Sequence, residues 1–402
     1  MNVLFLTTGR MSHIEDHAIY PDLLRQFRNH GHNVYHVSTY EKRVGKETEY
    51  VEECGTHALR VKIGNLTKVN IIEKGISTLM IEKQYLAAVK KFLSDVKFDL
   101  ILYSTPPITL VNVIQYIKKR DDAKTYLLLK DIFPQNAVDI GMMSATGVKG
   151  ILYKHFRKVE KKLYTVSDRI GCMSQANVDY VIKYNPEVDP DKVEICPNCI
   201  EVQDMSITDE ERVAIRNKYG IPQDKKVFVY GGNLGRPQGI PFIVECLKKL
   251  NGHPDAYFLV VGDGTEFGKL QAFMDDVKPT NIQLIKRLPK EDYDQLVCAC
   301  DVGLIFLDHR FTIPNFPSRL LSCLQAGLPV LAATDPNTDI GRVITEGGFG
   351  WWCESNDVSA FEAAVEKALQ ADTQTMGAKG TAFLQEHYKV DKAYQTIMKH
   401  NV

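Results

Sequence analysis

In Val227-Phe-Val-Tyr-Gly-Gly-Asn-Leu-Gly-Arg-Pro-Gln-Gly-Ile240, an apolar run leads directly into glycine-rich sequence. The same order recurs in Phe258-Leu-Val-Val-Gly-Asp-Gly-Thr-Glu266. A buried parallel strand that ends in a glycine turn before a helix is how α/β proteins present backbone N–H groups to phosphate. Two such units predict a domain with a crevice for a ligand that carries a diphosphate.

The bulk composition predicts two domains and excludes several classes of protein. A chain of 402 residues is longer than one hydrophobic core usually serves. It has no apolar run of about 18 residues, so no bilayer span is predicted. Its start, Met1-Asn-Val-Leu-Phe-Leu6, reads as a first strand and not as a signal peptide. We therefore expect a cytoplasmic protein, and the nine scattered cysteines fit a reducing compartment.

The charges and cysteines give no sign of nucleic-acid or metal binding. The net charge of −1 combines a first half with excess basic residues and a second half with excess acidic residues. No basic stripe is interleaved with aromatic residues, so a nucleic-acid partner is not predicted. Cys196-Pro-Asn-Cys199 has no second ligand pair, and we interpret its spacing as coincidence.

Strand and helix patterns alternate through both halves, which predicts an α/β protein with two tandem, doubly wound parallel sheets. We place one Rossmann-like domain at residues 1–200, a second at 201–385, and a final helix within 386–402. Residues 40–70 are charged and predict loop with short strands, and helical spacing predicts a long helix near 77–95. At the end of the linker, Thr208-Asp-Glu-Glu211 predicts a capping box.

Glycines and arginines after the strands of the second domain are the candidates for diphosphate binding. The glycines from Gly231 to Gly239 allow close approach to an anion, or they only permit a tight turn. Gly262-Asp-Gly264 is a common turn, in which Asp263 can cap the next helix. Arg287 and Arg319 follow predicted strands, and a guanidinium can donate two parallel hydrogen bonds to the oxygens of a phosphate.

Candidates for acid–base chemistry lie in the first domain. Asp131 directly follows a buried strand, where its carboxylate can act as a general base, hold a hydroxyl group, or only cap a helix. His13 and His17 lie in the first strand–helix loop, where imidazoles can exchange protons or are simply solvated.

Residues 148–164 predict a basic amphipathic helix. Its apolar residues are Val148, Ile151, Leu152, Phe156, Val159 and Leu163, and its basic ones are Lys149, Lys154, Arg157, Lys158, Lys161 and Lys162. Such a helix can lie on anionic lipid, and more commonly it packs on a core with its basic face solvated. Because the apolar stripe must also cover the sheet, we expect electrostatic attraction to a membrane and no insertion.

Taken in order, these residues resemble the family-4 glycosyltransferases of the GT-B fold, in the branch that builds bacterial capsule, O-antigen and exopolysaccharide. The matching motifs are Asp131-Ile-Phe-Pro-Gln-Asn136 with Gly141, Ile195-Cys-Pro-Asn198, Gly232-Asn-Leu-Gly-Arg-Pro-Gln-Gly239, Val261-Gly-Asp-Gly264 and Pro317-Ser-Arg-Leu-Leu-Ser-Cys-Leu-Gln-Ala-Gly-Leu-Pro-Val330. Each motif is weak alone, but five in order across nearly the whole chain are specific.

The resemblance implies a retaining transferase that needs no metal and no cofactor, because the nucleotide diphosphate sugar, expected to be a UDP-sugar, is its substrate. It implies a donor held mainly by the second domain, a lipid-linked or other saccharide acceptor held by the first, and a last helix that crosses back. We predict Asp131, Arg319, His13 and His17 as catalytic. The predicted donor-binding residues are Gly9, Gly232, Asn233, Gly235, Arg236, Gly262, Asp263, Gly264, Arg287, Asn315, Ser318 and Arg319.

The chain departs from the family pattern at three donor-side positions. Many members carry two glutamates eight positions apart, where this chain has Pro314 and Ser322, and a lysine where it has Gln238. These changes leave a second interpretation open, a catalytically weakened relative that acts as a binding or partner subunit. A sugar-nucleotide 2-epimerase is a third, with His309 beside Arg310 as its best support.

Overall fold

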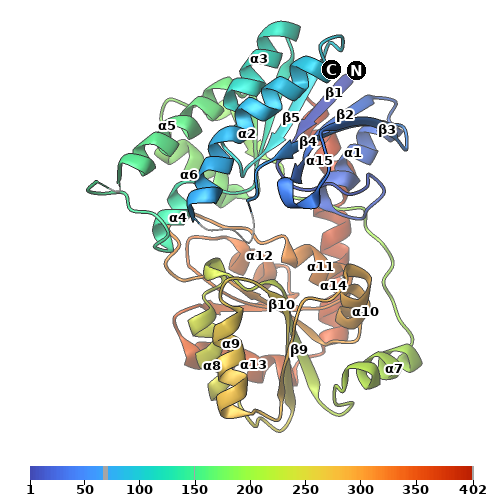
Figure 1. Ribbon diagram of the computed structural model, residues 1–402. Coiled ribbons are helices and arrows are strands. Elements are labelled where there is room, and N and C mark those ends of the chain that lie inside the picture. Colours follow the sequence, from blue (N-terminus) through green and yellow to red (C-terminus); the bar gives the residue numbers. More distant parts are fainter. Residues whose placement is uncertain (67–70, 149, 401–402) are drawn as a thin grey trace. The chain divides into compact units, whose positions relative to one another are not determined.

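The computed structural model describes residues 1–66, 71–148 and 150–400, and it divides the chain into two compact α/β units (Figure 1). Unit 1 comprises Met1–Glu201 and the chain from Lys389 onward, and unit 2 comprises Val202–Tyr388. The division lies one residue after the expected linker boundary, and the returning segment begins three residues later than expected. Among the described residues, no helix combines the length and the apolar character needed to cross a membrane.

Unit 1 is built on an eight-stranded sheet in the order β3-β4-β2-β1-β5-β6-β7-β8, in which only β3 is antiparallel to its neighbour. A parallel sheet needs helices on both of its faces, because each strand buries side chains on both sides. The strands are β1 (Asn2–Leu6), β2 (Asn33–Glu41), β3 (Glu49–Glu53), β4 (Thr56–Ile63), β5 (Leu100–Ser104), β6 (Lys124–Leu129), β7 (Arg169–Cys172) and β8 (Val193–Ile195).

The helices of unit 1 cover the two faces unequally. Side chains of α2, α3, α5 and α6 join Leu4 and Leu6 in one core cluster, while α1 and α15 join Val3 and Phe5 in another. The amide of Val390 donates to the carbonyl of Ile200, which fixes the start of α15. The helices are α1 (Ile19–Asn29), α2 (Ile71–Phe92), α3 (Val111–Asp121), α4 (Gln135–Asp139), α5 (Gly150–Val166), α6 (Gln175–Tyr184) and α15 (Val390–Met398).

Unit 2 contains a six-stranded, fully parallel sheet in the order β11-β10-β9-β12-β13-β14. Its strands are β9 (Lys226–Asn233), β10 (Ala256–Asp263), β11 (Ile282–Ile285), β12 (Val302–Phe306), β13 (Val330–Thr334) and β14 (Gly350–Glu354). Helices α8, α9 and α13 share one core cluster with these strands, whereas α11 packs against α14 and α10 against α7. The helices are α7 (Asp209–Tyr219), α8 (Ile240–Lys249), α9 (Phe267–Val277), α10 (Lys290–Cys298), α11 (Arg319–Gln325), α12 (Ile340–Glu346), α13 (Val358–Gln370) and α14 (Thr373–His387).

The predicted capping box at the start of α7 is confirmed. Thr208 Oγ1 accepts from the Glu211 amide at 3.2 Å, and the Glu211 side chain accepts from the Thr208 amide at 2.8 Å. The two hydrogen bonds satisfy N–H groups that otherwise lack partners in the first turn of a helix. The start of unit 2 after the linker is therefore determined by local sequence.

Two local predictions in unit 1 were confirmed in kind but not in detail. The charged stretch 40–70 contains the strands β3 and β4, and the long helix begins at Ile71 instead of near residue 77. Charge made the strands hard to place in the sequence, and in the structure the buried Arg60 of β4 pairs with Glu53 on β3. The edge strand β3 pairs with β4, and this pairing places the carboxylate of Glu53 beside the guanidinium of Arg60.

Candidate functional site

Asp131 lies at the carboxyl end of β6, where Thr105 holds the backbone on both sides of it. Thr105 Oγ1 donates to the Asp131 carbonyl at 3.0 Å and accepts from the amides of Lys130 and Asp131 at 3.0 and 3.2 Å. The Asn136 side chain of α4 donates to Asp131 Oδ1 at 2.6 Å. The carboxylate therefore has a defined position at the sheet edge where α/β proteins bind ligands.

The surroundings of Asp131 suit a general base. Burial raises the pKa of Asp131 to about 6, although hydrogen bonds from the Asn136 side chain and the Ile132 backbone act in the opposite direction. A carboxylate with a pKa in this range is ionised at neutral pH and accepts a proton more readily than an ordinary aspartate. The same residue can thus orient a hydroxyl group and remove its proton.

Gly9, His13 and His17 lie in the loop between β1 and α1. The Gly9 amide is bonded to Thr7 Oγ1 at 3.0 Å, and the His13 amide is bonded to Asp16 Oδ2 at 3.1 Å. His13 is exposed, and the side chain of His17 is half exposed with Nδ1 3.8 Å from Glu201 Oε2. No contact between either imidazole and Asp131 is present among the described residues. Their predicted catalytic role remains a prediction.

Sequence reasoning missed the residue that organises this loop, the buried Arg25 of α1. Its Nη1 donates to the carbonyls of Ile14 and Asp16 at 2.5 and 2.9 Å. Its Nη2 contacts Asp22 at 2.6 Å and Glu201, the last residue of unit 1 before the linker, at 2.7 Å. Arg25 therefore ties the first strand–helix loop to the end of unit 1, which no local motif could have shown.

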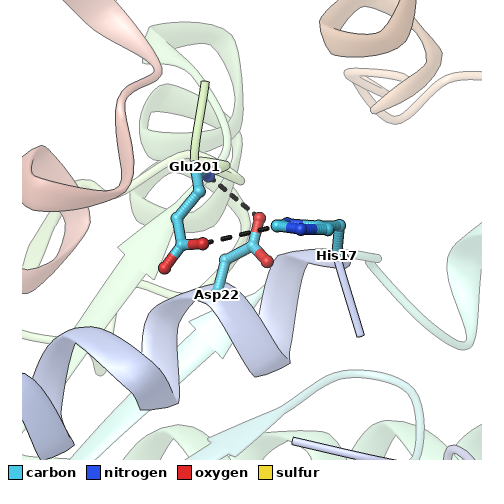
Figure 2. Close-up of side chains that lie close together, drawn as sticks. All are labelled: His17, Asp22 and Glu201. Carbon is cyan, nitrogen blue, oxygen red and sulfur yellow. Dashed lines mark hydrogen bonds and ion pairs between the residues drawn. The ribbon is translucent and has the colours of Figure 1, made fainter. Parts of the chain in front are cut away.

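Figure 2 shows how His17, Asp22 and Glu201 converge. Their ligand atoms lie within 4.8 Å of one another, and the Glu201 amide donates to Asp22 Oδ2 at 2.9 Å. Three such groups could ligate a cation, but the Arg25 guanidinium already forms ion pairs with both carboxylates. A metal would have to displace this buried ion pair, so the cluster is better explained as a structural one.

Arg319 is the central cation at the carboxyl edge of the unit 2 sheet. Its Nε donates to the Gly231 carbonyl at 2.5 Å, and its guanidinium carbon lies 4.3 Å from the centroid of the Tyr230 ring. Among the described residues, neither Nη1 nor Nη2 has a hydrogen-bond partner. Stacking on Tyr230 and the bond to Gly231 thus hold the group by one edge and leave the forked edge for an anion.

The glycines at this edge are required for close packing. A methyl group on Gly231 would lie 1.8 Å from the Tyr293 hydroxyl oxygen, and one on Gly232 would lie 2.8 Å from Arg319 Nη2. On Gly262, it would lie 2.0 Å from the Gly232 carbonyl oxygen. Gly232 also has φ of +134°, a conformation in which side chains are strained. These contacts within the protein are sufficient to explain the glycines at the two strand ends, and no ligand is needed to account for them.

The expectation that the loop amides face a ligand needs correction. The Leu234 amide donates to the Asp263 carbonyl at 3.0 Å, and the Gly235 amide donates to Gln238 Oε1 at 3.1 Å. The Gly264 amide is likewise bonded to Asp263 Oδ1 at 2.9 Å. Gln238, at the position where many family members have lysine, thus caps this loop. Arg319 is left as the main donor.

The other predicted donor-binding residues are exposed or partly exposed, and fewer contacts fix their side chains. Arg236 is exposed and its Nε lies 3.9 Å from Glu266, while Arg287 is exposed after β11. The exposed Asn233 side chain donates to Gln238 at 3.3 Å. Ser318 precedes α11 and is partly exposed. The structure brings Asn233, Gly235 and Gln238 together, and it brings Arg319 to Gly231 and Gly232.

Asp335, after β13, is a further residue that sequence reasoning missed. Its buried carboxylate accepts from the amides of Asn337 and Thr338 at 2.9 and 3.2 Å. The Asn337 and Thr338 side chains in turn donate to the carbonyls of Phe311 and Asn315. Burial raises the pKa of Asp335 to about 6. Its position after a buried strand, as for Asp131, was the available signal.

Comparison with known proteins identifies this arrangement. Residues 211–380 match the family model "Glycosyl transferases group 1". The second unit is a group 1 glycosyl transferase domain. The chain is 25% identical to the probable glycosyltransferase WbjE of Pseudomonas aeruginosa over 81% of this chain and 80% of that protein. It is 23% identical to the putative colanic acid biosynthesis glycosyl transferase WcaI of Escherichia coli strain K12, over 76% of this chain and 72% of that one.

The fold of the chain is GT-B, as the resemblance implied. HepE of Anabaena, in a crystal structure with UDP, superimposes with a TM-score of 0.68 at 14% identity, over 99% of each chain. The predicted fold class of two Rossmann-like units is therefore confirmed.

The chain lacks carboxylates at the two positions where many members of the family it resembles have glutamate. Pro314 is buried, and Ser322 is exposed on α11. Arg319 lies between them in sequence, and its guanidinium is the charged group closest to the β9 glycines among the described contacts. This edge therefore has a cation but no carboxylate at either of the two positions.

Proposed function

We propose that this glycosyltransferase moves a sugar from a nucleoside diphosphate sugar, most simply a UDP-sugar, to a lipid-linked saccharide in the assembly of a bacterial surface polysaccharide. The reaction retains the anomeric configuration and needs no metal. The observation that carries the proposal is Arg319, whose forked edge has no partner among the described residues. Crystal structures of the fold neighbour HepE with UDP and with UDP-glucose support the donor class.

The proposed chemistry requires stabilisation of a departing nucleoside diphosphate. As the bond to the anomeric carbon breaks, negative charge grows on the terminal phosphate oxygens. A positioned guanidinium stabilises this charge without a metal, and its hydrogen-bond donors need no reorganisation because Tyr230 and Gly231 already hold them. This is the role we assign to Arg319.

On the acceptor side, Asp131 orients the attacking hydroxyl group and receives its proton. Thr105 and Asn136 fix the carboxylate, and its raised pKa matches proton transfer near neutral pH. The names of the relatives WbjE and WcaI support a place in bacterial polysaccharide synthesis. A lipid-linked acceptor also fits the peripheral contact of residues 148–164 with an anionic membrane that we expect.

A thermal-shift panel tests the donor class directly. A ligand that binds only the native state stabilises it, by about 2.7 kcal/mol at a concentration 100 times its Kd, and so raises the unfolding midpoint. We expect UDP and at least one UDP-sugar to raise the midpoint, with uridine as the control that lacks the diphosphate. The same shift in the presence of EDTA supports metal independence. No shift with any nucleoside diphosphate would contradict the proposal.

The absence of carboxylates at Pro314 and Ser322 supports a second candidate, a weakened relative that binds donor without transferring it. Release of UDP from UDP-sugars, measured with purified protein against an empty-vector preparation, separates the two. Nucleotide binding without turnover under any acceptor condition would favour the binding subunit. Analysis of a transferred product by NMR gives the anomeric configuration, and an inverted product would refute retention.

A further inference from the structure

Four large apolar side chains are exposed together at the junction of α4 and α5. The exposed fractions are 61% for Met142, 86% for Val148, 68% for Ile151 and 52% for Leu152. Figure 1 shows that the loop between the two helices extends away from the rest of unit 1. We call these four residues the apolar tip. Single exposed apolar residues are ordinary, but four at one helix junction point to an interaction surface.

The apolar tip corrects the expectation of one continuous stripe that covers the sheet. Only the later part of that stripe packs on the core, where Leu163 is buried and Phe156 and Val159 are partly buried against it. The earlier residues, Ile151 and Leu152, face solvent instead. The core therefore does not account for the apolar character of the first turns of α5.

The exposed side of α5 is basic beyond the apolar tip. Lys154, Lys158 and Lys162 follow Ile151 at intervals of three or four residues, so they lie on its side of the helix. All three are exposed and have no ion pair among the described residues, while Lys161 pairs with Glu187 at 2.9 Å. Lys149 lies outside the described residues. The carboxylate of Glu160 is buried against Arg157, on the core side.

This combination selects an anionic bilayer over other partners. Apolar residues at one end of a helix and lysines along the same side match an interface in which acyl chains lie beneath anionic headgroups. A protein groove would bury the lysines at the cost of their hydration, whereas a headgroup layer keeps them solvated and adds attraction. We propose that the apolar tip inserts into an anionic membrane and that Lys154, Lys158 and Lys162 bind its headgroups.

The location of the tip adds to the argument, which here rests on the proposed lipid-linked acceptor. Helix α4 connects the tip to the candidate base, since Asn136 contacts Asp131 and the Gln135 side chain accepts from Tyr153 of α5 at 3.0 Å. The rings of Phe133 and Phe156 pack 5.1 Å apart across the same junction. A membrane bound at the tip would thus present a lipid-linked saccharide to the unit that carries Asp131.

Vesicle co-sedimentation of the full chain tests the inference. We expect binding to vesicles of phosphatidylcholine with phosphatidylglycerol, and weak binding to phosphatidylcholine alone. The Ile151→Ser/Leu152→Ser variant should bind at least about tenfold more weakly, because two large apolar side chains no longer enter the bilayer. Val213→Ser is the matched control, since Val213 is an exposed apolar residue of α7 in unit 2.

Insertion is measured separately from adsorption. A tryptophan in the Ile151→Trp variant should be quenched by brominated lipid, whereas the fluorescence of the parent chain should change little. The Lys154→Gln/Lys158→Gln/Lys162→Gln variant should lose the preference for anionic lipid and most of the salt dependence.

Three outcomes would overturn the inference. The first is unchanged vesicle binding by the serine variant, which would indicate adsorption by charge alone. The second is the absence of quenching in the tryptophan variant. The third is a parent chain that is dimeric in light scattering and becomes monomeric in the serine variant, because a second copy would then cover the tip. UDP release in detergent-free solution reports on the proposed function independently, so failure of either idea can be recognised.

Discussion

The two units share one architecture, but they hold opposite charges at the edge where their strands end. In unit 1 the group is a carboxylate, Asp131, whose burial raises its pKa to about 6. In unit 2 it is the Arg319 guanidinium, held over the Tyr230 ring. The net charges of the two halves have the opposite signs, because the first half of the chain has excess basic residues and the second half excess acidic ones. The local surroundings of one side chain, and not the sum of charges, therefore determine what each edge can bind.

The difference matches a division of labour between the two units. A carboxylate with a raised pKa takes up a proton, so it suits a hydroxyl group that becomes a nucleophile. A guanidinium that is stacked and held by one edge cannot lose its proton, so it suits a leaving group that gains negative charge. The following predictions test this contrast, from the largest expected effect to the smallest.

Replacement of the base should have the largest effect. Asp131→Asn keeps the hydrogen-bonding shape but cannot accept a proton, and we expect kcat to fall by about 10²–10⁴-fold. In the parent enzyme, activity should decline as the pH falls below about 6, since the carboxylate with that pKa becomes protonated. Rate–pH profiles of both proteins test this, with Asp139→Asn of α4 as the control. Normal transfer by Asp131→Asn would exclude the role.

Removal of the guanidinium should be the next most damaging change. For Arg319→Ala we expect kcat/KM for the donor to fall by on the order of a hundredfold or more, because a preorganised donor to the leaving group is lost. Arg319→Lys should recover only part of the loss, as an ammonium group does not form the paired contacts of a guanidinium. Steady-state UDP release gives both values, with the exposed Arg342→Ala as the control. Equal turnover by mutant and parent would contradict the assignment.

Loss of the buried carboxylate after β13 should act indirectly. Asp335→Ala leaves the amides of Asn337 and Thr338 without their acceptor, at a cost of about 1–3 kcal/mol each. We expect the unfolding midpoint of unit 2 to fall by roughly 2–4 °C per kcal/mol, and KM for the donor to rise more than kcat falls. Calorimetry with the exposed Asp255→Ala as control measures the first effect. A fall in kcat alone would argue against a positioning role.

The smallest effect concerns packing at the end of β9. Gly231→Ala places a methyl group against the Tyr293 hydroxyl group, and overpacking of this kind costs about 1–3 kcal/mol. Because Tyr293 is the obstacle, Gly231→Ala should lose less stability when Tyr293→Ala is also present, as a double-mutant cycle would measure. Gly268→Ala is the control, since a methyl group there meets no atom within 4 Å. Strict additivity would show that the clash is not the cause.

The sequence by itself determined the fold class, because apolar strands that lead into glycine turns have a physical meaning that needs no neighbours. The same is true of the capping box at Thr208 and of Asp131, which closely follows a predicted strand. Local hydrogen bonding and periodicity were sufficient in each case.

Only the tertiary structure decided the features that depend on contacts distant in sequence. The buried Arg60 of β4 is paired with Glu53 of the neighbouring strand, and Arg25 pairs with Glu201, which is distant in sequence. The amides of Gly235 and Gly264 proved to be bonded to nearby side chains, so Arg319 remains the candidate for anion binding. Helical periodicity placed Ile151 on the core side, whereas burial depends on where the neighbouring sheet ends. Which side chains form ion pairs and which become buried depends on contacts in the folded chain, so no local sequence pattern can specify them.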